Sequence, residues 1–389
     1  MSPPQLLPAG FTNRGYWLSS FKEPGKVMDL PTPQAGPGSA VVQVVATLIL
    51  PYVAKVHRGE IPQLNLALPL VPNANCVGRV LEGGADAARI RPGDWVWVDG
   101  TVHARDDALV KIVQGHHGGE GPEGRVLMQG EWRDGSMQKV MKAPLESCHL
   151  INKEYLFGQE GHAPEELTPI ILYNIAGGAI FETARVQVGE TVVIGPATGS
   201  FGGAAVELAL LSGARVIMLG RSEATLRTMK ERLGSPEKLQ YIAMSGDEDK
   251  DAEAIRKLAP GGVDVFNDWT PGWFEKPLYL PAALKTLNPW ARIVLSGAPY
   301  GKLELPYKTA LHLNWQVLAR WANTRDTLVR IVKLINYGVL KIGKSGGSEF
   351  KTFDTIEDVE GAKEHAADGG RFKSYTVLKP NGDVKPALK

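Results

Sequence analysis

The sequence is poor in cysteine and in long apolar runs, and each shortage excludes a class of protein. It has two cysteines, Cys76 and Cys148, among 389 residues. Two thiols cannot form a disulfide framework or a four-cysteine zinc site, and they suit a reducing cytosol. No apolar stretch is long enough to span a bilayer, so we expect no membrane partner.

Excess charge of one sign is also absent. The formal net charge is +1, and the sequence has no long basic run, so nothing indicates a nucleic-acid partner. The first residues lack the pattern of a secretory signal, and we expect a cytoplasmic protein. The length and the 43% hydrophobic content allow two domains with a sizeable core.

The first part of the chain has the pattern of a β-rich domain. Residues 39–50 alternate in polarity and are dense in β-branched side chains, which predicts a strand. Residues 76–84 and 94–100 predict shorter strands that close on glycine. Residues 101–130 are rich in glycine and charge, and they predict a loop.

From about Thr168, strands alternate with helices, which predicts a parallel sheet covered by helices. Ser222 is a suitable N-cap for one helix, and Gly234 is a suitable stop for it. A further helix is expected at 354–369 and a last strand at 371–380. The remaining elements are strands at 190–195, 214–220, 263–268 and 291–297 and helices at 202–213 and 222–234.

The strongest motif is a glycine-rich loop inside residues 192–209. A buried strand runs into Gly195 and further glycines and then into a helix. Such glycines let the backbone approach a pyrophosphate, and the helix N-terminus offers free N–H groups. The strand, the helix and a second strand are all present, so we expect a dinucleotide site rather than a turn without ligand. The residues expected to bind it are Pro196, Ala197, Thr198, Gly199, Ser200 and Phe201.

The end of the second strand selects the cofactor, because an acidic residue there would hold the ribose of NAD. This chain has Gly220, Arg221 and Ser222 instead. Arg221 can pair with a 2′-phosphate and Ser222 can donate to it, whereas Glu223 falls in the first helical turn, where acids are common. We therefore expect NADPH (NADP+), the alternative being that Arg221 is a solvated surface residue.

These residues resemble those of a known family. The chain is similar to the medium-chain dehydrogenases/reductases, of the zinc-independent quinone oxidoreductase and trans-acting enoyl reductase kind. The resemblance covers nearly the whole length. The segments that carry it are 91–98, 186–203, 263–271, 291–299 and 362–380.

The resemblance implies an α/β protein of two domains. A GroES-like β-rich domain would occupy 1–165 and be completed by 311–389. A Rossmann domain with a doubly wound parallel sheet would occupy 166–310. The resemblance also implies an active-site cleft between them, a small-molecule substrate and a homodimer.

The positions of the family's catalytic zinc ligands hold other residues here. Alignment by eye puts Leu50 where the cysteine ligand would be, and Ala74 and Asn75 at the His-Glu pair. Cys76 is displaced by one position. His116 and the adjacent His117 lie in the expected flexible loop, which is a poor chelating geometry. We therefore expect no metal.

Without a metal, the charge that develops on a carbonyl oxygen needs another partner. Lys55 falls where trans-acting enoyl reductases carry an active-site lysine, so the resemblance implies a catalytic role for it. The phenol of Tyr52 could donate a proton or a hydrogen bond. The alternative is that Lys55 is a surface lysine and Tyr52 packs the domain edge.

The loops after the later strands are expected to flank the nicotinamide. They would contribute Trp269 and Thr270, then Gly297 and Ala298, and also Asn323. Asn174 precedes the first strand of the Rossmann domain, where the family lines its cleft, and Trp273 could line a pocket for a bulky substrate. Core packing is the alternative for any single tryptophan.

Three functions remain open from the sequence. The first is NADPH-dependent, metal-free transfer of hydride to an activated C=C of an enone, enoyl thioester or quinone. The second is zinc-free reduction of a simple carbonyl. The third is nucleotide binding without redox chemistry, in a structural role or in a cyclisation.

Overall fold

The computed structural model describes residue 7 and residues 10–387, which fall into two compact units. Unit 1 takes the chain up to Ile171, then Ile335–Gly370, then the residues from Ser374 onward. Unit 2 takes Leu172–Leu334 and the short segment Arg371–Lys373. Within the described residues, no helix combines the length and the apolar character that crossing a membrane requires.

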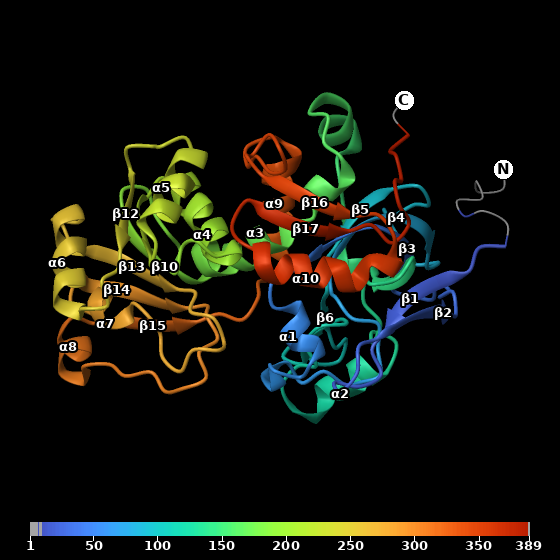
Figure 1. The fold of residues 1–389 in the computed structure, drawn as a ribbon, viewed down its shortest axis with the longest axis horizontal. Helices are drawn as coiled ribbons and strands as arrows, with labels where there is room; N and C mark the ends of the chain where they lie inside the picture. The colour runs from blue at the N-terminus through green and yellow to red at the C-terminus, as the bar shows by residue number, and fades with distance from the viewer. Residues whose placement is uncertain (1–6, 8–9, 388–389) are drawn as a thin grey trace. The chain divides into compact units, whose positions relative to one another are not determined.

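Unit 2 is built on a six-stranded sheet in which every neighbouring pair of strands is parallel. The strand order is β12-β11-β10-β13-β14-β15 (Figure 1). From β10 the sheet therefore extends through β11 and β12 in one direction and through β13, β14 and β15 in the other, which is the doubly wound order of the Rossmann fold. The strands are β10 (Thr191–Gly195), β11 (Arg215–Gly220), β12 (Leu239–Ala243), β13 (Val263–Asp268), β14 (Leu287–Leu295) and β15 (Gln316–Ala319).

Helices cover both faces of this sheet because successive side chains of a buried strand point to opposite faces. Val193 and Phe266 pack in one cluster with Ile255 of α6 and Leu280 of α7. On the other face, α4 contacts β10 and β11, and α5 contacts β11 and β12. The helices are α3 (Ile170–Gly177), α4 (Ser200–Leu211), α5 (Glu223–Arg232), α6 (Glu248–Leu258), α7 (Leu280–Leu284), α8 (Tyr307–His312) and α9 (Arg325–Asn336).

Unit 1 is centred on the long strand β3 (Ser39–Ile49), whose side chains are almost all buried. The sheet runs in the order β16-β17-β3-β4-β5-β9, and β8 also pairs with β3. Ribbons β1-β2 and β6-β7 lie apart from this sheet. The other strands are β1 (Asn13–Trp17), β2 (Lys26–Leu30), β4 (Cys76–Gly83), β5 (Trp95–Val98), β6 (Thr101–His103), β7 (Lys111–Val113), β8 (Val140–Pro144), β9 (Cys148–Leu150), β16 (Glu349–Phe353) and β17 (Ser374–Leu378).

The end of the chain completes unit 1, because β17 pairs antiparallel with β3 and parallel with β16. Helix α10 (Val359–Gly369) packs beside them through buried Val359 and Ala362, in one cluster with Ile49. The expected helix at 354–369 is thus found, preceded by a 3-10 turn at Ile356–Asp358. The other helices of unit 1 are α1 (Val53–His57) and α2 (Gly121–Gln129).

The expected loop at 101–130 is wrong in part, because it contains β6, β7 and the whole of α2. Helix α2 has Pro122 in its first turn, where the missing N–H of proline costs nothing. Its residue Met128 is fully buried. Because glycines stand at 121 and 124, the composition of this segment predicted a loop and not a helix.

Candidate functional site

The glycine-rich loop of unit 2 ends in an uncapped helix. β10 stops at Gly195, and α4 begins at Ser200 with Gly199 at the N-cap and no side-chain cap. The first N–H groups of α4 are therefore available to an anion, and the helix dipole favours negative charge there. Gly199 is exposed, and a Cβ built on it would meet no atom within 4 Å. This open, donor-rich end fits the pyrophosphate of a dinucleotide.

Two other glycines of the loop serve packing. A Cβ at Gly202 would lie 2.2 Å from the carbonyl oxygen of Pro196. A Cβ at Gly203 would lie 2.1 Å from Cγ of Phe372, whose N–H donates to the Thr198 carbonyl at 3.3 Å. The loop is thus closely packed at Gly202 and Gly203, whereas Gly199 faces open space.

The end of β11 presents a basic and a hydroxyl side chain to solvent. Arg221 and Ser222 are both exposed. The predicted capping role of Ser222 is confirmed, because its oxygen accepts the N–H of Thr225 at 3.3 Å. Since this oxygen uses its lone pairs, the hydroxyl proton is left to donate. The pair therefore fits a phosphate group, which takes both charge and hydrogen bonds.

The end of β13 holds a buried carboxyl that sequence reasoning missed. Asp268 is 1% exposed and accepts the hydroxyl of Thr270 at 2.7 Å. Burial raises the pKa of Asp268 to about 6, against the hydrogen bonds from Thr270. The Thr270 hydroxyl in turn accepts the N–H of Leu278 at 3.0 Å. Asp268 therefore holds the side chain of Thr270, a residue predicted for the cofactor, in place. In the sequence, the only signal for Asp268 is its position at the end of a predicted strand.

Trp269 is anchored rather than free to move. Its indole N–H donates to Oδ1 of Asn267 at 2.7 Å. Its ring stacks on Phe201, with centroids 5.9 Å apart and planes 11° apart. The N–H of Trp269 also donates to the Gly195 carbonyl at 2.8 Å. These contacts join the ends of β10 and β13, the two strands on either side of the point where the strand order reverses.

The end of β14 lies against the same loop. The N–H of Ala298 donates to the Thr270 carbonyl at 2.9 Å, and a Cβ at Gly297 would lie 2.6 Å from Oδ2 of Asp268. The structure thus brings together, at the carboxyl edge of one parallel sheet, most of the residues predicted for the cofactor. Ligands of open parallel sheets bind at this edge. The residues are Pro196, Ala197, Thr198, Gly199, Ser200, Phe201, Gly220, Arg221, Ser222, Trp269, Thr270, Gly297 and Ala298.

Two buried carboxamides of unit 2 have polar atoms without a hydrogen-bond partner among the described residues. Asn174 on α3 is fully buried, and neither its oxygen nor its nitrogen makes a hydrogen bond. Asn323 is 6% exposed, and its oxygen also lacks a partner. A buried polar group without a partner costs free energy, so such groups mark a place that a ligand or water completes. Trp273, by contrast, is exposed.

Tyr52 and Lys55 belong to unit 1 and lie on one short helix. Tyr52 precedes the first residue of α1, and Lys55 follows three residues later; both are half-buried. The hydroxyl of Tyr52 lies 3.4 Å from Nε2 of His116. Burial raises the pKa of Tyr52, so the phenol is neutral at physiological pH.

The positions matched to zinc ligands have other roles in unit 1. Oδ1 of Asn75 accepts the N–H of Gly100 at 2.8 Å, and Leu50 packs against an apolar cluster. Cys76 is 1% exposed, and burial raises the pKa of its thiol. Across the described part of the chain, no three His, Cys, Asp or Glu side chains are grouped so as to hold a metal ion.

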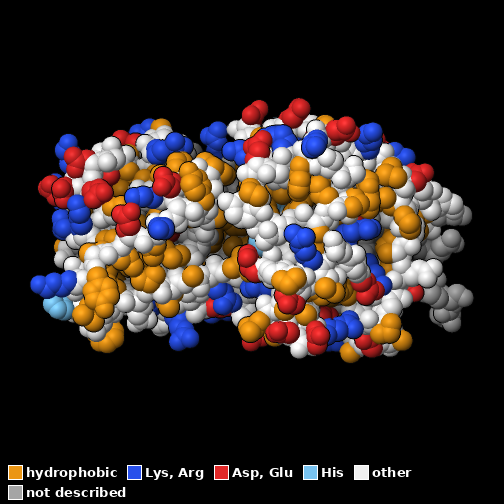
Figure 2. Space-filling model, turned by 90° about the horizontal axis from the view of Figure 1, so that it is seen from below, with side chains coloured by type: hydrophobic (Ala, Val, Ile, Leu, Met, Phe, Trp, Pro, Cys, Tyr) orange, Lys and Arg blue, Asp and Glu red, His pale blue; other side chains and the backbone are white. Residues whose placement is uncertain are grey.

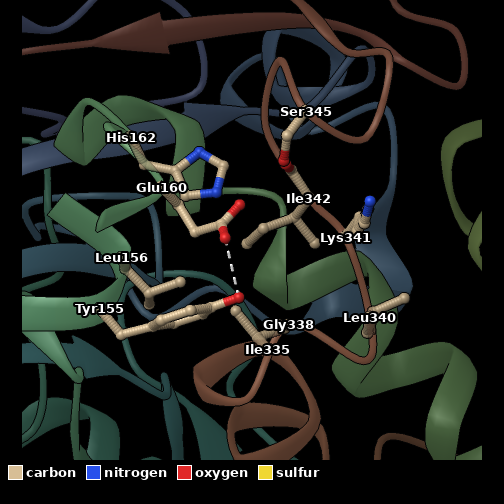
Figure 3. A pocket seen from close by; sticks show the side chains of 10 residues that line it. All are labelled: Tyr155, Leu156, Glu160, His162, Ile335, Gly338, Leu340, Lys341, Ile342 and Ser345. Atoms are coloured by element: carbon tan, nitrogen blue, oxygen red, sulfur yellow. Dashed lines mark hydrogen bonds between the residues drawn. The ribbon is translucent and has the colours of Figure 1, made fainter. Parts of the chain in front are cut away.

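A small cavity in unit 1 involves none of the predicted site residues. Figure 3 shows it lined by Tyr155 and Leu156 on one side and by the chain from Ile335 to Ser345 on the other. Among the lining residues, the hydroxyl of Tyr155 donates to Glu160 at 2.9 Å. The residues predicted for the cofactor lie instead at the carboxyl edge of the unit 2 sheet, where a Cβ at Gly199 would meet no atom within 4 Å.

Two family models match the chain in agreement with these two architectures. The alcohol dehydrogenase GroES-like domain matches residues 36–153. The zinc-binding dehydrogenase family matches residues 201–336. Together they span more than half of the sequence.

Curated relatives match parts of the chain. A highly reducing polyketide synthase, phiA, of a fungus (strain ATCC 74256) is 27% identical over 55% of this chain and 8% of its own length. The NADPH-dependent curcumin reductase of Escherichia coli (strain K12) is 30% identical over 33% of this chain and 34% of its own length. The chain thus matches 8% and 34% of the length of these two relatives.

Among solved structures, the crystal structure of AibC has the same fold. The TM-score is 0.74 at 22% sequence identity, over 95% of this chain and 96% of that one. The order of the six parallel strands, the GroES-like unit and the two family matches have one common explanation: the chain belongs to the medium-chain dehydrogenase/reductase superfamily.

Proposed function

We propose that this chain is an NADPH-dependent reductase that transfers hydride to an activated C=C without a metal. The acceptor would be a small molecule such as an enone, an enoyl thioester or a quinone. When bound, NADPH supplies the hydride. The chain's own residues bind the dinucleotide and meet the charge that develops on the acceptor oxygen.

The observation that carries the cofactor choice is the end of β11. Arg221 and Ser222 are exposed, and Ser222 keeps a hydroxyl proton to donate. Gly220 is buried, and a Cβ there would lie 3.1 Å from Cδ2 of Leu226, so this glycine serves the packing of α5. An acidic residue, which would favour NAD, is absent from these three positions. The name of the matched Escherichia coli relative, NADPH-dependent curcumin reductase, supports the same cofactor and a reductive reaction.

In this proposal, the dinucleotide lies along the carboxyl edge of the unit 2 sheet. The uncapped N-terminus of α4 holds the pyrophosphate, and Arg221 holds the 2′-phosphate. Asn323 and Asn174 gain partners for their buried carboxamides from the nicotinamide or the substrate. Within the described residues, both polar atoms of the Asn174 carboxamide and the oxygen of the Asn323 carboxamide have no hydrogen-bond partner.

Lys55 and Tyr52 would stabilise the enolate oxygen formed by hydride attack at the β-carbon. Lys55 offers a cation and Tyr52 a neutral phenolic donor. This arrangement replaces a Lewis acid, because Leu50 and Ala74 carry no ligand atom at the positions matched to zinc ligands. The bond formed is C–H at the β-carbon, NADPH is oxidised to NADP+, and water supplies the proton for the α-carbon.

We also propose a cytoplasmic homodimer that uses the free edge of β15. This strand ends the unit 2 sheet, and Val317 on it is 40% exposed. Figure 2 looks at the side that carries α8 and shows apolar side chains gathered over this part of unit 2. The exposed apolar residues of unit 2 include Tyr307 and Leu311 of α8 and also Trp290, all more than half exposed. An exposed apolar edge strand is a template for pairing with a second chain.

The dimer is tested by light scattering of the purified chain. We expect twice the monomer mass for the natural sequence and the monomer mass for Val317→Lys, with Val188→Lys, an exposed residue before β10, as the control. A natural chain of monomer mass at micromolar concentration contradicts this part of the proposal.

Two measurements test the reductase. Titrations with NADPH and with NADH, in which quenching of tryptophan fluorescence reports binding, should show clearly tighter binding of NADPH. Oxidation of NADPH at 340 nm with 3-nonen-2-one should then yield the saturated ketone. An allylic alcohol as product would favour carbonyl reduction, and binding without turnover across enones and quinones would favour a role without redox chemistry.

A further inference from the structure

A tyrosine and a histidine far apart in the sequence meet in unit 1. The Tyr52 hydroxyl lies 3.4 Å from Nε2 of His116, and their rings are 5.8 Å apart at 52°. Both side chains are half-buried. Sequence reasoning treated Tyr52 as a candidate acid and His116 as a poor metal ligand, and it gave no reason to pair them.

The backbone holds both residues in place. Val53 donates to the Leu50 carbonyl at 3.0 Å, which fixes the turn that carries Tyr52. His116 donates its backbone N–H to the Val113 carbonyl at 2.8 Å. Gly115 has φ +67°, and a Cβ there would lie 2.8 Å from Cα of Gly135. The turn before His116 is therefore tightly packed.

The surroundings keep the imidazole neutral. Burial lowers the pKa of His116 to about 4, and the neighbouring His117 adds to this effect. His57 on α1 is also buried, and burial, Lys363 and His116 lower its pKa well below the usual value. A neutral imidazole has one N–H and one free lone pair, so it can donate from Nε2 to an oxygen.

We propose that His116 is the positioning residue of Tyr52: its Nε2–H donates to the phenolic oxygen and leaves the phenolic proton free for the acceptor oxygen. This inference rests on the proposed reductase function. A donor on the phenolic oxygen strengthens the hydrogen bond that the phenol itself makes, because chains of hydrogen bonds polarise one another. The contact tightens when the enolate forms, as catalytic hydrogen bonds do.

The step that Tyr52 assists is balanced without further reagents. Hydride from NADPH forms the C–H bond at the β-carbon of the enone, and the π electrons move onto oxygen as an enolate. The phenolic proton stays on Tyr52 and is shared with that oxygen. Water then gives the α-carbon its proton, and the carbonyl reforms.

The kinetic test is a double-mutant cycle on the full chain, with NADPH and 3-nonen-2-one. Tyr52→Phe and His116→Leu should each lower kcat by about tenfold or more, with KM and the NADPH Kd within about twofold of the natural chain. The double variant should lose no more than Tyr52→Phe alone, because His116 acts through Tyr52. His116→Gln, which keeps an N–H at that reach, should restore much of kcat.

The control is His103→Leu, which removes an exposed imidazole bonded to its own loop. It should leave kcat unchanged. Full activity of His116→Leu would overturn the role of His116. The role would also be overturned if His116→Leu lowered kcat by the same factor in the natural chain and in Tyr52→Phe. A natural chain that binds NADPH and reduces no enone or quinone would instead overturn the proposed function.

A spectroscopic readout tests the hydrogen bond without turnover. Long-range ¹H–¹⁵N spectra of the eight histidines should show His116 neutral at pH 7 with its proton on Nε2, assigned by its loss in His116→Leu. Tyr52→Phe should change the ¹⁵N chemical shift of Nε2 of His116 and leave the chemical shifts of the His103 nitrogens unchanged. A proton on Nδ1 would mean that Tyr52 donates to His116, and that result would overturn the proposal.

Discussion

The ammonium of Lys373 lies 2.9 Å from Oε1 and 3.0 Å from Oε2 of Glu207, and the lysine side chain is fully buried. Both groups also contact the hydroxyl of Tyr173. Glu207 belongs to α4, the helix whose first turn forms the candidate pyrophosphate site. The pair thus ties the short segment 371–373 to the helix that holds the glycine-rich loop.

We expect Lys373→Met to destabilise the protein by about 3 kcal/mol, because it leaves a largely buried carboxylate without its cation. Urea unfolding measures this change. Lys302→Met, at an exposed position, is the matched control and should cost less than about 0.5 kcal/mol. Adding Glu207→Gln to Lys373→Met should recover part of the loss, and a purely additive double variant would contradict the pairing.

Arg221→Ala should weaken NADPH binding by roughly 10–100-fold, since an arginine–phosphate hydrogen bond is worth about 1.5–3 kcal/mol. The Kd for NADH, which lacks the 2′-phosphate, should change by less than about twofold. Fluorescence titration gives both constants. Arg227→Ala, an exposed arginine on α5, is the control. Equal losses for both nucleotides would refute selection of the 2′-phosphate at this position.

Gly199→Ala should fold normally and bind NADPH about tenfold or more weakly. A Cβ at Gly199 meets no protein atom, and its φ of −74° suits alanine. The added methyl would instead occupy the space where the backbone must approach the pyrophosphate. Thermal unfolding checks that the variant folds normally, and NADPH titration measures the loss of binding. Gly261→Ala, also with open space, is the control, and an unchanged Kd for Gly199→Ala would place the pyrophosphate elsewhere.

Asp268→Asn should stabilise the protein at pH 7 and not at pH 4. Burial raises the pKa of Asp268 to about 6 in the folded chain, from about 4 when unfolded. The folded state therefore binds the proton more tightly, and stability falls as pH rises from 4 to 6. The variant removes this cost, worth about 2–3 kcal/mol at pH 7. Denaturant unfolding at both pH values measures it, with the exposed Asp326→Asn as the control; a gain at pH 4 would contradict the assignment.

The sequence was sufficient for the architecture of unit 2. Alternating strands and helices predicted the parallel sheet, and the glycine loop at Gly195–Gly203 occupies the predicted strand-to-helix junction. The N-cap at Ser222 was predicted from residue type and is confirmed by its hydrogen bond. These features depend on local spacing, which a single sequence contains. The roles of the predicted site residues and the domain boundaries stay predictions.

The missed features depend on contacts between distant segments. Asp268 is a perturbed acid only because β14 and the Thr270 loop bury it. His116 meets Tyr52 across 64 positions of the chain. Helix α2 was not predicted because its glycines weaken the helical pattern, while the burial of Met128 stabilises the helix. Composition and periodicity carry no information on such pairings.

The segment 371–373 also governs how this protein can be divided. Its neighbours Gly370 and Ser374 belong to unit 1, whereas the three residues themselves complete unit 2. A fragment that stops at Leu334 would lose the cation opposite Glu207 and the ring of Phe372 that fills the space above Gly203. A fragment meant to fold as unit 2 on its own therefore needs these three residues joined to Leu172–Leu334.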